Sequence, residues 1–130
     1  MIILVAFDGS NVARDAIALA EKHATVFNAE IILMHSMLGG PDVPRKDFET
    51  AENNLEHEKS LLLEKKIPCT SILSVRGLDA GEDLIKLADE KKVDEIIIGV
   101  RRRSKVGKLI FGSTAQYVIL NAPCPVVSVK

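Results

Sequence analysis

The sequence predicts an α/β fold: a single domain built on a doubly wound parallel sheet with helices on both faces. Continuous apolar runs rich in Ile, Leu and Val alternate with longer segments whose apolar residues recur at helical spacing. The alternation continues along all 130 residues, in the order β-α-β-α-β-α-β-α-β. Apolar runs without polar alternation are typical of strands buried on both faces. The pattern therefore predicts five parallel strands between two helical layers.

The first strand is predicted over residues 2–7, IILVAF, which are apolar throughout and end at the turn sequence DGS (8–10). A helix follows to residue 27, because its apolar residues recur every three or four positions and Ser10 or Asn11 can cap its start. Residues 29–37, AEIILMHSM, form the second predicted strand. These three segments make one β-α-β unit.

The middle of the chain continues the pattern after a predicted loop over 38–44, which carries two Gly and two Pro. Residues 45–66 predict a long charged helix with a narrow apolar stripe, and IPCTSILSV (67–75) predicts the third strand. Residues 76–92 predict a turn followed by a helix. The stretch ENNLEHEK within the long helix lacks metal-ligand spacing and is interpreted as a solvated helix face.

The last part of the chain predicts the fourth strand over 93–100, a short helix over 112–122 and a closing strand over 123–130. A basic loop separates the fourth strand from this helix. Right-handed crossovers between parallel strands leave a doubly wound sheet as the simplest topology. We expect the strand order 3-2-1-4-5.

Positive charge is concentrated in the last quarter of the chain. Residues 1–95 hold 18 acidic and 11 basic residues, a balance of −7, whereas residues 96–130 hold 6 basic residues and no acidic one. Five of those cations lie within 101–108. Aromatic residues are only 4% of the chain and its net charge is −1, which argues against a nucleic-acid binder that stacks bases. A phosphate in a pocket is the favoured partner of the basic loop. Nucleic acid is the weaker alternative, and a membrane surface is weaker still.

The predicted topology indicates where a ligand would bind. In open doubly wound sheets, ligands bind beyond the carboxyl ends of the strands, where the strand order reverses. With the order 3-2-1-4-5 this point lies between the first and fourth strands. Asp8, after the first strand, then faces Gly99 and the basic loop that follows the fourth. Asp8 could instead only cap a turn, and Gly99 could be only a tight turn.

The helix predicted from residue 112 has a start that suits an anion. Backbone N–H groups and the helix dipole favour negative charge there, and Gly112 has no side chain to obstruct a phosphate. Ser113 and Thr114 add hydroxyl groups. Two common phosphate motifs are excluded: Gly107-Lys108 lacks the Walker A spacing and its Ser or Thr, and the DGSNVA sequence after the first strand is not G-x-G-x-x-G.

On these residues the chain resembles the universal stress proteins, specifically their ATP-binding branch, which carries G-2x-G-9x-G-[ST] after its fourth strand. Gly99 fits the first position, Gly112 the third and Ser113 the [ST] position, with both spacings intact. The middle position departs from the pattern, since it is Arg102 in place of glycine. The likeness covers residues 1–130 as one domain, including Asp8 and the final APCPVVSVK. It implies a Rossmann-like fold of the adenine nucleotide alpha hydrolase type.

The resemblance implies an adenine nucleotide as ligand, with AMP or ADP as acceptable as ATP. Asp8 would lie near the ribose, the phosphates or a bound Mg²⁺, Ser36 would offer backbone groups to adenine, and Ile98 would lie beneath the base. Arg102 either grips the phosphates through its guanidinium group or blocks the site. The implied nucleotide-binding residues are Ala6, Phe7, Asp8, Ser36, Ile98, Gly99, Arg101, Arg102, Gly112, Ser113 and Thr114.

The resemblance also implies a stress-response or signalling module that acts as a homodimer through the apolar closing strand, whose open edge invites pairing. A cytoplasmic location is expected from the two cysteines, which form no metal-type or redox-type pair. Two alternatives stay open: a slow ATP hydrolase, and a nucleotide-free stress protein acting through protein contacts. His35 is interpreted as a structural histidine with satisfied hydrogen bonds. Cys69 and Cys124 are interpreted as reduced, small buried residues, and the family topology makes a disulfide between them unexpected. No signal peptide or membrane-spanning run is evident.

Overall fold

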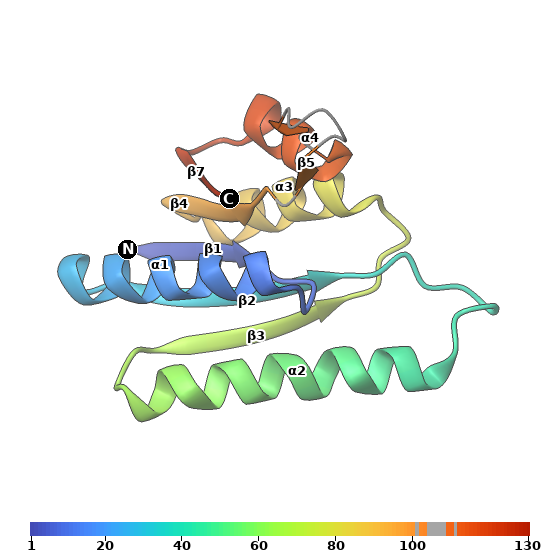
Figure 1. The fold of residues 1–130 in the computed structure, drawn as a ribbon, viewed down its shortest axis with the longest axis horizontal. Coiled ribbons are helices and arrows are strands. Elements are labelled where there is room, and N and C mark those ends of the chain that lie inside the picture. Colours follow the sequence, from blue (N-terminus) through green and yellow to red (C-terminus); the bar gives the residue numbers. More distant parts are fainter. Residues whose placement is uncertain (101, 104–108, 111) are drawn as a thin grey trace.

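The fold is seen in a computed structural model that describes residues 1–100, 102–103, 109–110 and 112–130, with side chains left undescribed at 102, 103, 109 and 110. Strands and helices alternate along the chain as predicted (Figure 1). The strands are β1 (Ile2–Ala6), β2 (Glu30–Ser36), β3 (Cys69–Ser74), β4 (Glu95–Gly99), β5 (Arg102–Arg103), β6 (Leu109–Ile110) and β7 (Val126–Val129). The helices are α1 (Asn11–Phe27), α2 (Arg45–Glu64), α3 (Ala80–Lys91) and α4 (Ser113–Asn121).

Five parallel strands form the sheet in the order β3-β2-β1-β4-β7, which confirms the predicted order 3-2-1-4-5. β1 lies at the centre, where Leu4 is in register with Ile32 of β2 on one side and Ile96 of β4 on the other. β1 is apolar throughout because both of its faces are covered. The strand order reverses at β1. The chain therefore leaves the carboxyl ends of β1 and β4 toward opposite faces of the sheet, to α1 and α4.

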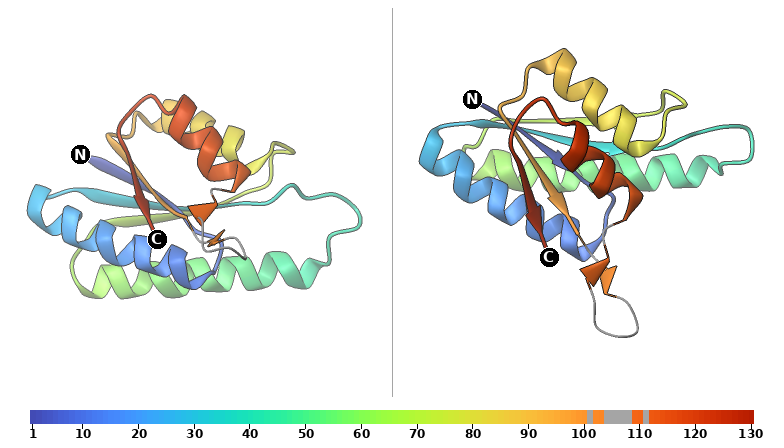
Figure 2. Two further views of the ribbon diagram at one scale, coloured as in Figure 1. Left: turned by 45° about the horizontal axis from the view of Figure 1, so that its top comes forward. Right: turned by 90° about the horizontal axis from the view of Figure 1, so that it is seen from above.

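Helices α1 and α2 cover one face of the sheet, and α3 and α4 cover the other (Figure 2). Successive side chains of β1 alternate between the two layers. Ile3 and Val5 pack beneath α1 and α2, whereas Leu4 packs beneath α3 and α4. The doubly wound α/β fold class is therefore confirmed.

The basic loop contains a feature that the sequence analysis missed. Two short strands, β5 and β6, pair antiparallel within the segment that was predicted to be loop throughout. The predicted closing strand is also shorter than expected and starts at Val126. Pro123 and Pro125 lack the backbone N–H that a ladder needs. Over the described parts of the chain, no helix is both long and apolar enough to cross a membrane.

Candidate functional site

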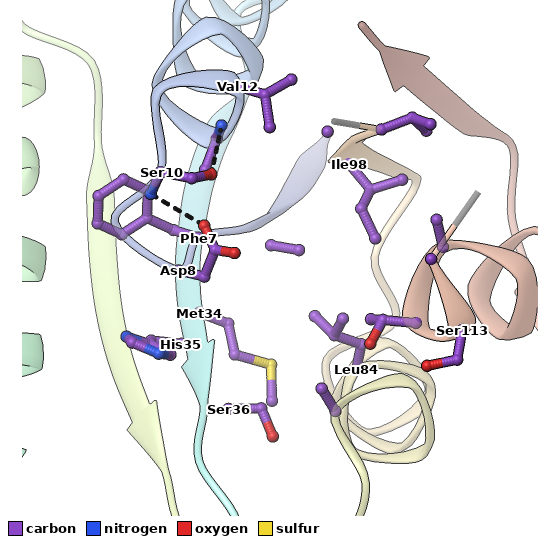
Figure 3. A pocket seen from close by; sticks show the side chains of 18 residues that line it. Phe7, Asp8, Ser10, Val12, Met34, His35, Ser36, Leu84, Ile98 and Ser113 are labelled. Carbon is purple, nitrogen blue, oxygen red and sulfur yellow. Dashed lines mark hydrogen bonds between the residues drawn. The ribbon is translucent and has the colours of Figure 1, made fainter. Parts of the chain in front are cut away.

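A cavity of about 350 Å³ opens beyond the carboxyl ends of β1, β2 and β4 (Figure 3). The starts of α1, α3 and α4 complete its walls. It therefore lies at the point where the strand order reverses, as the topology predicted. Its lining residues are Ala6, Phe7, Asp8, Ser10, Val12, Ala13, Met34, His35, Ser36, Ala80, Leu84, Ile98, Gly99, Val100, Gly112, Ser113, Thr114 and Ala115.

The turn after β1 holds Asp8 at the edge of this cavity. Gly9 has a positive φ of 85°, a conformation that glycine adopts without strain. The Asp8 Oδ1 atom accepts a hydrogen bond of 3.0 Å from Ser10 N, and Ser10 Oγ accepts one of 3.2 Å from Ala13 N (Figure 3). Ser10 is thus the N-cap of α1, one of the two caps expected. Asp8 caps the turn and also lines the cavity. Capping the turn therefore does not prevent Asp8 from facing a ligand.

The start of α4 differs from that of α1, because its N-cap residue has no side chain that could cap it. Gly112 is the N-cap residue, and the first turn of α4 carries no acidic side chain. The first helical hydrogen bond runs from Gln116 N to Gly112 O. The N–H groups of residues 113–115 precede that bond and have no acceptor within the helix. These donors and the positive end of the helix dipole lie at the cavity wall, where they suit an anion.

The side of the cavity formed by β1, β2, β4, α3 and α4 is mainly apolar. Ala6, Met34 and Ile98 come from the strands, and Leu84 and Ala115 come from α3 and α4. Figure 3 shows Met34, Ile98 and Leu84 around the cavity. Leu84 and Met34 are almost fully buried. A slot with apolar walls suits a flat, uncharged group such as an aromatic ring.

Ser36 brings polar atoms to the end of this slot. The ladder between β1 and β2 ends with a 2.8 Å bond from Phe7 N to Met34 O, while Met37 N bonds to Ser74 O on β3. Backbone groups alternate in direction along a parallel strand, so the N–H and C=O of Ser36 point to the side that β1 has just left. They offer one donor and one acceptor side by side.

The Ser36 hydroxyl joins an ion-pair network centred on Asp83, a buried residue of α3. Ser36 Oγ donates to Asp83 Oδ2 at 2.6 Å, and Arg76 Nε donates to Asp83 Oδ1 at 2.8 Å. Arg76 also pairs with Glu90 at 2.7 Å. Burial by itself raises the pKa of Asp83, but hydrogen bonds from Ser36, Ser74 and Arg76, together with the Arg76 charge, outweigh burial and hold this pKa below its usual range. Asp83 is fully buried and remains ionised.

The two motif glycines have different surroundings. A Cβ on Gly99 would lie 2.8 Å from Cγ1 of Val12, so glycine is needed there for close packing against α1. A Cβ on Gly112 would meet no described atom within 4 Å, and its φ of −67° is ordinary for any residue. Neither packing nor backbone conformation within the described chain requires Gly112. Its missing side chain leaves space at the cavity wall.

His35 lies between the cavity and the layer of α1 and α2. Its Nδ1 atom is buried and has no hydrogen-bond partner among the described residues, so the interpretation of a satisfied structural histidine is wrong. Burial lowers the pKa of His35, and the negative charge of Asp8 partly opposes that effect. A neutral His35 therefore lines the cavity near neutral pH.

The structure brings together nine of the predicted site residues. They are Ala6, Phe7, Asp8, Ser36, Ile98, Gly99, Gly112, Ser113 and Thr114. Phe7 borders the cavity although its ring belongs to the core beneath α1 and α2. Arg101 lies outside the described residues, and so does the side chain of Arg102, whose backbone belongs to β5.

The contribution of α3 to the site was not predicted from the sequence. Ala80 and Leu84 line the cavity, and Asp83 accepts the hydrogen bond from the Ser36 hydroxyl. One signal was available: Asp83 lies three residues after Ala80 and four before Leu87, on the apolar face of the predicted helix. A carboxylate on such a face requires buried partners. Within the described residues, no cluster of three or more His, Cys, Asp or Glu is arranged to hold a metal ion.

Comparison with known proteins agrees with this architecture. A universal stress protein from Archaeoglobus fulgidus superposes with a TM-score of 0.91 at 35% identity, covering 100% of this chain and 98% of its own. A second structure, of the universal stress protein from Archaeoglobus fulgidus in complex with dAMP, has a TM-score of 0.85 at 30% identity with the same coverage. A universal stress protein from Thermus aquaticus is 33% identical over 98% of this chain and 97% of its own. The sequence profile of the Universal stress protein family matches residues 1–130, and the chain belongs to that family.

Proposed function

We propose that this protein binds an adenine nucleotide in the cavity at the carboxyl ends of β1 and β4. One observation carries the proposal: the same cavity joins an apolar slot with a polar end to an uncapped helix N-terminus. The slot fits a purine ring, and the helix start fits a phosphate. The related Archaeoglobus fulgidus protein in complex with dAMP, 30% identical over the whole chain, supports this class of ligand.

In this proposal the base lies between Ile98 and Leu84, with its hydrogen-bonding edge toward the backbone of Ser36. Adenine presents a donor at N6 beside an acceptor at N1, which complements the C=O and N–H of Ser36. The α-phosphate lies at the start of α4. It accepts hydrogen bonds there from the first-turn N–H groups and from the Ser113 and Thr114 hydroxyls.

Asp8 faces the phosphate side and fits a shared Mg²⁺ site. Magnesium is commonly held by one or two carboxylates together with substrate phosphates, and among the described lining residues Asp8 supplies one carboxylate. Such a site forms only with a nucleotide that carries β- or γ-phosphates. We therefore propose metal-assisted binding for ADP and ATP and metal-independent binding for AMP.

The direct test is to purify the protein, denature it and identify any released small molecule by mass spectrometry. The proposal expects AMP, ADP or ATP in amounts close to the amount of protein. The same extraction on a Gly112→Ala variant is the matched control. Release of a different compound in stoichiometric amount would contradict the proposal.

We further propose that two copies pair through β7 and that this dimer serves a stress-response or signalling role. β7 is an edge strand of the sheet, and Val126, Val127 and Val129 are only half-buried in one chain. An open edge with apolar side chains favours pairing with another strand. Pairing of the two β7 strands about a two-fold axis would then join the two sheets into one.

A further inference from the structure

The apolar slot, where we place the base, ends at Ser36, whose hydroxyl proton is already used in a hydrogen bond. Ser36 Oγ donates to Asp83 Oδ2 at 2.6 Å, a short distance typical of a bond to a charged acceptor. Asp83 is fully buried, and its other oxygen accepts from Arg76 Nε at 2.8 Å. The Ser74 side chain also favours the ionised form of this carboxylate. Ser36 Oγ and Arg76 Nε, two hydrogen-bond partners of the carboxylate oxygens, are both donors, as a buried carboxylate requires.

Asp83 fixes the direction of the Ser36 hydroxyl. An ionised carboxylate can only accept hydrogen bonds, and a serine hydroxyl has a single proton and two lone pairs. With the proton directed at Asp83, the remaining lone pairs are all that Ser36 Oγ can offer to the slot. Ser36 lines the cavity together with Met34 and Leu84, which supply no hydrogen bonds of similar strength. The slot therefore accepts a hydrogen bond at this point and cannot donate one through Oγ.

We propose that Asp83, acting through Ser36, makes the pocket select 6-amino purines over 6-oxo purines. The inference rests on the proposed nucleotide function and names the residues that determine base specificity. The 6-amino group of adenine has two protons, so it can donate one to the Ser36 C=O and the other to Ser36 Oγ. The oxygen at C6 of hypoxanthine or guanine would bring a second acceptor against Oγ, and both would lose their hydrogen bonds to water. Ser36 is the specificity-determining residue, and Asp83 is the positioning residue.

AMP and IMP provide the matched probe pair, because they share the ribose and phosphate and differ at the base edge. We expect wild-type protein to bind AMP more tightly than IMP by about tenfold or more in calorimetric titrations. In Ser36→Ala the ratio of the two Kd values should fall about tenfold. Ser36→Thr retains the hydroxyl and should retain the ratio. The ratio is informative because a purely structural defect weakens both nucleotides alike.

Ser74→Ala is the matched control. It removes a hydroxyl that also favours the ionised form of Asp83, but Ser74 lies on β3 and does not line the nucleotide cavity. Its Kd ratio should equal that of the wild type. If Ser74→Ala lowers the ratio as much as Ser36→Ala, the effect is structural and the inference is overturned.

Asp83→Asn should shift the preference of the pocket from AMP toward IMP. Arg76 has only donors, so the new amide must direct its oxygen to Arg76 and its NH₂ group to Ser36. The Ser36 proton is then released toward the slot, where it can donate to a 6-oxo group. We expect IMP to gain affinity relative to AMP. Circular dichroism establishes whether this variant folds, and if it does not, the Ser36 and Ser74 variants decide alone.

The outcomes separate the two proposals. If wild-type protein binds neither AMP nor IMP, the nucleotide function itself fails and the specificity inference falls with it. If it binds AMP but Ser36→Ala leaves the Kd ratio unchanged, the nucleotide function stands and the inference about Asp83 and Ser36 is overturned.

Discussion

Gly99 at the end of β4 and Val12 at the start of α1 lie so close together that no side chain fits between them. A Cβ on Gly99 would lie 2.8 Å from Cγ1 of Val12 and 3.1 Å from its carbonyl oxygen. Both residues line the cavity. This contact seats the first turn of α1 against β4, so it sets the width of the site as well as the packing of the core.

Gly99→Ala should therefore destabilise the fold. The added methyl group meets backbone as well as a β-branched side chain, and relief requires a shift of α1. Overpacking of this kind costs about 1–3 kcal/mol of unfolding free energy. Urea denaturation measures the loss. A variant as stable as the wild type would show that α1 moves away at no cost.

Gly112→Ala should lower nucleotide affinity and leave the stability of the fold nearly unchanged. A Cβ there meets no described atom within 4 Å, so the unfolding free energy should change by less than about 1 kcal/mol. The methyl group enters the space where we place the phosphate, so AMP affinity should fall about tenfold. Calorimetry and denaturation on the same sample compare the two effects. Unchanged AMP affinity would show that the phosphate does not bind at the start of α4.

Protonation of His35 should make the fold less stable in mild acid. Its folded-state pKa is lowered from the ordinary value of 6.5, because burial disfavours the charged imidazolium. Between that value and the lower folded-state pKa, the unfolded chain binds more protons, so unfolding free energy falls as the pH falls. His35→Gln should remove this part of the pH dependence. Equal slopes for the two proteins in denaturation curves from pH 5 to pH 8 would contradict the prediction.

Asp8→Asn should separate metal-assisted from metal-independent binding. An asparagine Oδ1 can still accept the bond from Ser10 N, so the turn should persist. Loss of the carboxylate charge should weaken ATP binding in Mg²⁺ by about tenfold and leave AMP binding without metal nearly unchanged. Titrations of both nucleotides, with and without EDTA, make the comparison. Equal losses for AMP and ATP would place Asp8 on the ribose or base.

Ser128→Pro should break the proposed dimer without unfolding the chain. Ile96 N bonds to Pro125 O and Val100 N bonds to Val129 O, so the odd-numbered carbonyl groups of β7 face β4. By alternation, the N–H of Ser128 faces the open edge, where proline removes only an outward donor. Light scattering should give a dimer for wild type and Ser128→Ala and a monomer for Ser128→Pro. A monomeric wild type at about micromolar concentration would sink the proposal.

Cys69 should be slow to alkylate in the folded protein. Burial raises the pKa of its thiol to about 11, and the thiolate is the reactive form. Iodoacetamide treatment near pH 7.5 followed by mass spectrometry should label Cys69 far faster after denaturation than before. Rapid labelling of Cys69 in the native protein would show that β3 opens readily at the sheet edge.

Much of the fold could be predicted because one physical signal runs through the chain. The apolar run 2–7 must be covered on both faces, and its alternation with helical segments implies helices on each side of a parallel sheet. The position of the cavity followed from the strand order. The pairing of β5 with β6 could not be predicted, because two-residue strands leave no measurable periodicity in the sequence.

The candidate site was less completely predictable. Asp8 and Gly112 stand out because they directly follow a strand or directly precede a helix. Asp83 and His35 depend on contacts between segments far apart in the chain: Asp83 lies 47 residues from Ser36, its hydrogen-bond donor. Sequence patterns report which face of a helix is buried, but they do not report which donor meets a carboxylate there. That pairing depends on how α3 packs against β2.

Calorimetric titration of the nucleotide-free protein with AMP decides whether the cavity binds an adenine nucleotide. The proposed function predicts saturable binding of one AMP per chain, with a Kd below about 1 mM that weakens in Gly112→Ala and is kept in Ser74→Ala. Absence of saturable binding for AMP, ADP and ATP, in a protein whose fold is intact by circular dichroism, would contradict it.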